Sequence, residues 1–138
     1  MQVRFDYGNA VGGIKESLQV MQKELGYSRE QCLKMIGLTV KANVENALPR
    51  SDKIKKKRVP HMKDDVTYTL KTSRTGERYV SIRGGKKTAS LWHLVNDGHV
   101  AENGTFVAGN HFVERAVSQS EKEIEQIADM FVEGILDG

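Results

Sequence analysis

The C-terminal part of the chain carries an apolar stripe whose members recur every three to four residues. Side chains with this spacing fall on one face of an α-helix, because the helix completes a turn every 3.6 residues. We therefore expect one long amphipathic helix from about His111 to Leu136, which must bury a face against the rest of the fold. Its expected inner positions are Val113, Ala116, Val117, Ser120, Ile124, Ile127, Ala128, Phe131 and Ile135.

Two more helices are expected near the N-terminus. A first helix is predicted from about residue 10 to residue 25, where apolar residues are again three and four apart. Ser28, with Gln31 three residues later, has the pattern of a capping box at the start of a second helix. Pro49 is expected to stop that helix, and Gly37 inside it costs about 1 kcal/mol relative to alanine. The first stripe comprises Val11, Ile14, Leu18, Met21 and Leu25.

Three segments alternate between apolar and polar residues, as a half-buried β-strand does. They are residues 2–7, 66–71 and 79–83. The last two are separated by a loop of about five to eight residues, so we expect them to pair as a β-hairpin. Residues 100–107 predict either a loop or a second, short hairpin.

The segment that contains Trp92 predicts a short helix, from about residue 88 to residue 95. This helix ends in an Asn96-Asp97-Gly98 turn. Two interpretations of Trp92 stay open: packing in the core beneath the sheet, or anchoring a contact with a neighbouring subunit.

This order of elements predicts an α+β fold, in which a small antiparallel β-sheet packs against N-terminal helices and a long C-terminal helix. The chain has 138 residues, enough for a single domain (1–138), with a basic, flexible loop at about 50–63. Cys32 is the only cysteine and is expected to pack in a helix as a small apolar side chain. No apolar run approaches a membrane span and no signal peptide is evident, so we expect no membrane partner.

Charge is unevenly distributed along the chain. Residues 50–87 contain 13 basic and four acidic residues, a net charge of +9, whereas residues 112–138 contain two basic and seven acidic residues, a net charge of −5. Opposite charges on different segments predict two partners, or a contact between the middle of one copy and the end of another. Our hypothesis is that a partner or DNA is contacted by Lys53, Lys55, Lys56, Lys57 and Arg58.

Candidate catalytic and ligand-binding groups have simpler interpretations. The four histidines match no zinc-site spacing. The adjacent Asp64 and Asp65 are better explained as a solvated strand start than as a general acid–base or magnesium pair. The stretch Gly84–Thr88 lacks the first glycine of a phosphate-binding loop, because Val80 stands there, and is expected to be a connecting turn. We therefore expect no enzyme activity, cofactor or metal.

Three segments, in order, resemble the HK-ninety-seven gp-ten-like family of siphophage tail-completion or head–tail joining proteins. His61–Val66 is similar to the family's first sheet segment, with His61 where glycine is common. Trp92–His99 is similar to a segment that ends in an acidic-glycine turn, with His99 where threonine is usual. Phe112–Ala116 closely matches the family's F-(L/V)-x-x-A helix start.

The resemblance implies a structural virion protein of the phage neck, present in the host cytoplasm during assembly and then at the head–tail junction. Such proteins form a ring around the DNA channel without a cofactor. They join the head connector or adaptor to tail-tube or terminator proteins. We expect subunit contacts to involve Trp92, Asp97, Glu121 and Glu125, and contact with DNA in the channel to be nonspecific. The alternative is a small basic nucleic-acid-binding protein that uses the +9 segment and binds with a steep salt dependence.

Overall fold

The computed structural model describes residues 2–6, 13–48 and 61–137, and over them the chain has the expected α+β fold. Among these residues, no helix combines the length and the apolar character that crossing a membrane requires. The basic segment 53–58 lies outside the described residues. The elements are β1 (Gln2–Asp6), α1 (Gly13–Leu25), α2 (Arg29–Ala47), η1 (Met62–Asp64), β2 (Val66–Thr72), β3 (Arg78–Gly84), η2 (Ala89–Leu91), α3 (Trp92–Asp97), β4 (Gly98–Val100), β5 (Phe106–Ala108) and α4 (Phe112–Asp137).

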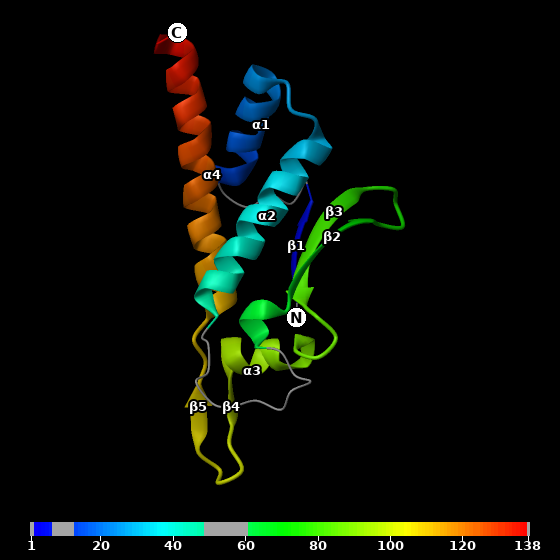
Figure 1. Ribbon diagram of the computed structural model, residues 1–138, viewed down its shortest axis with the longest axis vertical. Coiled ribbons are helices and arrows are strands. Elements are labelled where there is room, and N and C mark those ends of the chain that lie inside the picture. The colour runs from blue at the N-terminus through cyan, green and yellow to red at the C-terminus, as the bar shows by residue number, and fades with distance from the viewer. Residues whose placement is uncertain (1, 7–12, 49–60, 138) are drawn as a thin grey trace.

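Helix α2 is the middle layer of the molecule. Helices α1 and α4 lie on one side of it, and the three-stranded sheet lies on the other (Figure 1). The sheet is antiparallel with the order β1-β3-β2, so the N-terminal strand pairs with β3. Strands β4 and β5 form a separate two-stranded hairpin, which extends beyond the N-terminal end of α4 (Figure 1).

The core fills the space on both sides of α2. Within the described part of α4, the expected inner stripe is confirmed, since its members are buried or half-buried. A polar contact crosses the α2–α4 seam: the buried Asn43 amide donates to Ser120 Oγ at 2.9 Å and to Glu123 Oε2 at 3.0 Å. The fully buried side chains of α2 and of the described part of α4 include Cys32, Leu33, Ile36, Val40, Val44, Phe112, Ala116, Ser120 and Ile124.

Local signals in the sequence placed several boundaries correctly. The capping box of α2 is confirmed, with Ser28 Oγ accepting from Gln31 N and Gln31 Oε1 accepting from Ser28 N. The β2–β3 loop spans residues 73–77, within the expected length. Cys32 is buried in α2, and burial raises the pKa of its thiol.

Gly37 explains how closely α2 approaches the sheet. A Cβ atom at this position would collide with the Tyr68 ring on β2 and would lie 2.6 Å from Val80 Cγ2 on β3. The cost of a glycine inside a helix is therefore offset by close packing of the helix on the sheet.

We predict that Gly37→Ala lowers the free energy of unfolding by about 1–3 kcal/mol, because overpacking outweighs the gain of about 1 kcal/mol in helix propensity. Chemical denaturation measures this difference. Ala42→Gly, at an exposed position of the same helix, is the matched control and isolates the propensity effect. A Gly37→Ala protein more stable than the wild type would contradict the packing argument.

Candidate interaction surface

The buried side chain of Asn96 joins the end of α3 to the start of α4. Its Nδ2 donates to Asp97 Oδ1 at 2.8 Å and to Glu114 Oε1 at 3.2 Å, and its Oδ1 accepts from Val113 N at 2.9 Å. Its backbone carbonyl accepts from His111 N at 3.1 Å. Because the β4–β5 hairpin lies between these two helices, this cluster of hydrogen bonds fixes the base of the hairpin.

Trp92 and Phe112 pack against each other beneath the same junction. Their rings meet edge to face, with centroids 5.2 Å apart and planes at 79°, and both side chains are fully buried. Trp92 therefore belongs to the core, and the expectation that it contacts a neighbouring subunit is wrong for this conformation, since the indole has no exposed surface. Gly84 gives the indole its space, because a Cβ there would lie 2.6 Å from Trp92 Nε1.

The hairpin begins and ends at positions that need glycine. Gly98 has a φ of +94°, which L-residues rarely adopt. A Cβ on Gly98 would lie 2.6 Å from Val107 O and 2.7 Å from Phe106 Cζ, and one on Gly109 would collide with the Asn96 carbonyl. The Phe106 ring therefore lies over Gly98, and the chain passes directly from the Asn96 junction into the two strands.

One face of the hairpin is apolar along its whole length. Val100 and Phe106 are directly opposite each other, as are Gly98 and Ala108, so all four residues share that face. Val100 is 67% exposed and Phe106 is 63% exposed. We call these four residues the hairpin face. Exposed apolar surface on a projecting element is typical of a contact with another polypeptide.

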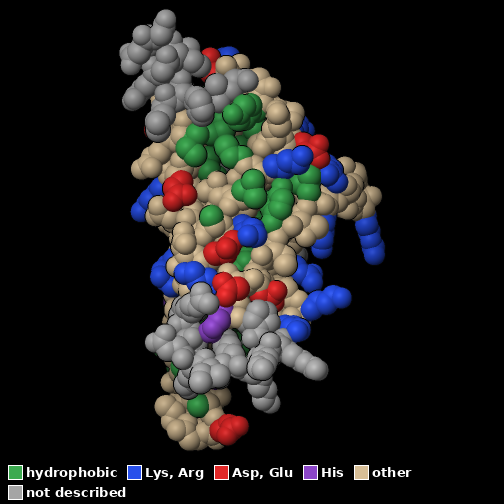
Figure 2. All heavy atoms as spheres, viewed as in Figure 1, with side chains coloured by type: hydrophobic (Ala, Val, Ile, Leu, Met, Phe, Trp, Pro, Cys, Tyr) green, Lys and Arg blue, Asp and Glu red, His purple; other side chains and the backbone are tan. Residues whose placement is uncertain are grey.

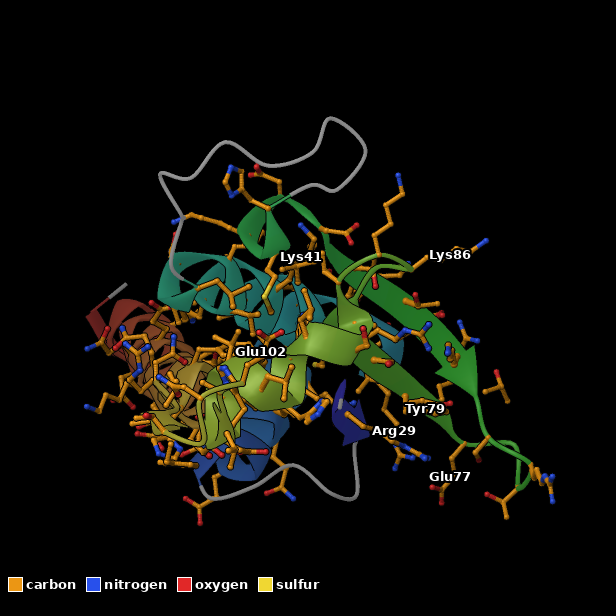
Figure 3. The ribbon with its side chains drawn as sticks, turned by 90° about the horizontal axis from the view of Figure 1, so that it is seen from below. Arg29, Lys41, Glu77, Tyr79, Lys86 and Glu102 are labelled. Carbon is orange, nitrogen blue, oxygen red and sulfur yellow. The ribbon has the colours of Figure 1, made fainter. Side chains whose placement is uncertain are left out.

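The tip of the hairpin, residues 101–105, closes on itself. Ala101 N donates to Thr105 O at 2.8 Å, and Thr105 N donates to Asn103 Oδ1 at 3.0 Å. Gly104 has a φ of +83°, which completes the turn. Glu102 is exposed on this tip and is labelled in Figure 3, which views the molecule from the hairpin end.

A line of carboxylates runs from the base of the hairpin along α4. Asp97 and Glu114 accept hydrogen bonds from the same Asn96 amide nitrogen. Glu121 and Glu125 follow Glu114 by seven and eleven residues, which is about two and three helical turns, so they lie on the same face of α4. Asp97, Glu114 and Glu125 are exposed and Glu121 is half-buried. Glu121 and Glu125 therefore lie about two and three helical turns from the junction at which Asp97 lies. The expectation that these three acidic residues contact a neighbouring subunit stays a prediction.

Basic side chains gather on a different part of the surface, around β2 and β3 (Figure 2). Arg78 donates to Glu30 Oε1 at 2.9 Å, and this hydrogen bond lowers the pKa of the Glu30 carboxyl. Figure 3 labels Lys86, in the turn that follows β3, apart from Glu102, which lies in the tip of the β4–β5 hairpin. The exposed bases of this region are Arg74, Arg78, Arg83, Lys86 and Lys87.

The stretch from Gly84 to Thr88 is a connecting turn, as expected. Gly85 N donates to Asp65 O at 2.8 Å, and Thr88 Oγ1 donates to Asp65 Oδ2 at 2.8 Å. The Asp65 carboxylate therefore lies beside this turn and disfavours the binding of an anion there. Within the described ranges, no three His, Cys, Asp or Glu side chains are placed to share a metal ion.

A shallow hollow of about 250 Å³ lies between α2 and α4. Four of its six lining residues are polar, and the lining consists of Asn43, Asn46, Ala47, Arg115, Ala116 and Gln119. Arg115 reaches across it, and its Nη2 donates to Ala47 O at 3.3 Å. The hollow is thus a seam between two helices that already contact each other. The hairpin face exposes more apolar side-chain surface, through Val100 and Phe106.

We predict that Asn96→Ala lowers the free energy of unfolding by about 1–3 kcal/mol, because the part-buried Val113 N–H loses its acceptor. The same change should speed hydrogen exchange of the hairpin amides. Asn103→Ala, which removes a side-chain acceptor at the exposed tip, is the matched control and should cost at most about 0.5–1 kcal/mol. Equal losses in the two variants would show that Asn96 does not organise the junction.

The comparisons with known proteins returned no match: no family model, no curated protein and no solved structure is similar to this chain.

Proposed function

We propose that this protein is a structural component of a bacteriophage virion that completes the tail or joins head to tail, assembling as a ring around the DNA channel. The proposal draws on the order of motifs in the sequence and on the surface that those motifs build. Its expected location is the head–tail junction of the virion, after assembly in the host cytoplasm.

The observation that carries the proposal is the hairpin face on its fixed base. Two of the segments that resemble the neck-protein family, Trp92–His99 and Phe112–Ala116, are the segments that hold this hairpin from either side. They meet through the Trp92–Phe112 ring contact and the hydrogen bond from Val113 N to Asn96. We infer that these two segments serve to present an apolar surface, which suits a protein that acts through contacts with other polypeptides.

The charges of the surface support ring formation by copies of one chain. The acidic line of α4 and the bases around β2 and β3 lie on different elements and carry opposite charge, so the two surfaces are complementary between copies. A head-to-tail contact between unlike faces is the kind that closes into a ring. The proposed partners beyond the ring are the head connector or adaptor and the tail-tube or terminator proteins.

We predict that the protein is present at the head–tail junction of purified virions, where immunogold labelling and mass spectrometry would detect it. Deletion of its gene should give filled heads and separate tails, because the joining surface is missing. Complementation with the wild-type gene is the control. Normal particles from the deletion strain, together with absence of the protein from virions, would contradict the proposed function.

We also predict a role for the basic segment. Changing Lys53, Lys55, Lys56, Lys57 and Arg58 to Glu should block head–tail joining while leaving the monomer folded, because it reverses the charge offered to a connector or to DNA. Replacing the four lysines with arginine preserves the charge and serves as the control. Circular dichroism checks folding, and phage yield measures joining.

An unchanged yield from the charge-reversed variant would refute a role for these five residues. Tight DNA binding by the purified wild-type protein, with a steep loss of affinity as salt increases, would instead favour a nucleic-acid-binding protein. The neck proposal predicts weak binding to DNA at most.

A further inference from the structure

We propose that the hairpin face of one copy packs on the exposed side of α2 in the next copy, with Phe106 and Val100 against Leu38. This inference deepens the proposed function and rests on it for the closing of the ring. It names the contact that relates neighbouring subunits and identifies the occupant of the hairpin face as a second copy of this chain.

The hairpin is an incomplete structural unit by itself. Strands β4 and β5 have three residues each, and β4 touches the rest of the molecule mainly through α3. A lone two-stranded hairpin is only marginally stable in water and needs a layer packed on its apolar face. Among the described residues nothing covers this face, since Val100 and Phe106 remain more than half exposed. A second copy of the chain can supply the missing layer.

Helix α2 offers a matching apolar surface. Leu38 is 58% exposed at the middle of this helix, although its neighbours Gly37 and Val40 are buried. Ala42 is exposed one turn after Leu38 on the same side of the helix, whereas Met35, one turn before it, is half-buried against the core. Hydrophobic side chains gather on this face of the molecule over α1, α2 and the adjoining sheet (Figure 2).

The two surfaces also have complementary charges. The hairpin face is followed at the tip by the exposed acid Glu102, whereas Leu38 is flanked on α2 by Lys34 and Lys41. Lys41 is engaged with Glu45 at 2.6 Å in the same helix. Lys34 is exposed one turn before Leu38, where it also acts electrostatically on the Glu30 carboxyl of the same helix. It is the base that we expect Glu102 of a neighbouring copy to meet.

The position of the two surfaces makes the contact intermolecular. The hairpin extends beyond the N-terminal end of α4, and Leu38 lies midway along α2, away from that end (Figure 1). One copy therefore cannot cover its own hairpin face with its own Leu38. A contact between two different surfaces repeats from copy to copy and generates a closed ring or an open filament.

The test places a photo-crosslinking amino acid at position 106 of the full-length protein. A mixture of ¹⁴N- and ¹⁵N-labelled copies distinguishes links between copies from links within one. The purified protein is irradiated at high concentration, and the experiment is repeated in cells that assemble particles. We expect a link from position 106 to residues 31–45 of a second copy. A link to any other segment or polypeptide, or no link to a second copy in either setting, would overturn the proposed contact.

Charge exchange provides an independent measure. Glu102→Lys and Lys34→Glu should each weaken self-association by about tenfold in sedimentation analysis, and the double variant should recover most of that loss. Phe106→Ser should abolish association, whereas Leu91→Ser, at an exposed apolar site outside both surfaces, should not. Association that survives Phe106→Ser, or no recovery in the double variant, would also overturn the contact.

The outcomes separate this contact from the proposed function. A protein found at the head–tail junction whose position 106 links to a different polypeptide would retain the function and lose the contact. The expected link between copies, in a protein that is absent from virions, would retain the contact and lose the function.

Discussion

The buried amide of Asn96 is the interaction on which the projecting part of this protein depends. This side chain of α3 bonds to residues of both helices, since it accepts from the Val113 N–H and donates to Asp97 and Glu114. A buried polar group of this kind is costly unless all its partners are in place. The geometry of the junction is therefore restricted, and the Trp92–Phe112 pair fills the space beneath it.

The predictable part of the fold was the part encoded by neighbouring residues. The capping box at Ser28, the inner stripe of α4 and the β2–β3 loop all follow from spacings of a few residues. The pairing of β1 with β3 joins segments about 75 residues apart, and nothing local in the sequence specifies it. The same is true of the close approach of α2 to the sheet at Gly37. From the sequence alone, this glycine only lowers the stability of the helix, and its packing role appears when the sheet is in place.

The candidate surface was only partly accessible from sequence for a similar reason. Strands β4 and β5 are three residues long, too short for alternation to distinguish a hairpin from a loop. The sequence points to Asp97 through its turn and to Glu121 and Glu125 through the acidic character of the last helix, whereas the hydrogen bond that places Glu114 beside Asn96 becomes visible only in the structure. Trp92 was ambiguous because a large aromatic side chain suits a core and an interface equally well; its contact with Phe112 resolves the choice.

The turn at the end of the β4–β5 hairpin is held by its own hydrogen bonds, which run between residues 101 and 105. The base of the hairpin is held separately, through Asn96. A tip of another sequence or length should therefore cost the folding of the domain little. The scaffold and the tip are thus separable parts of one structure.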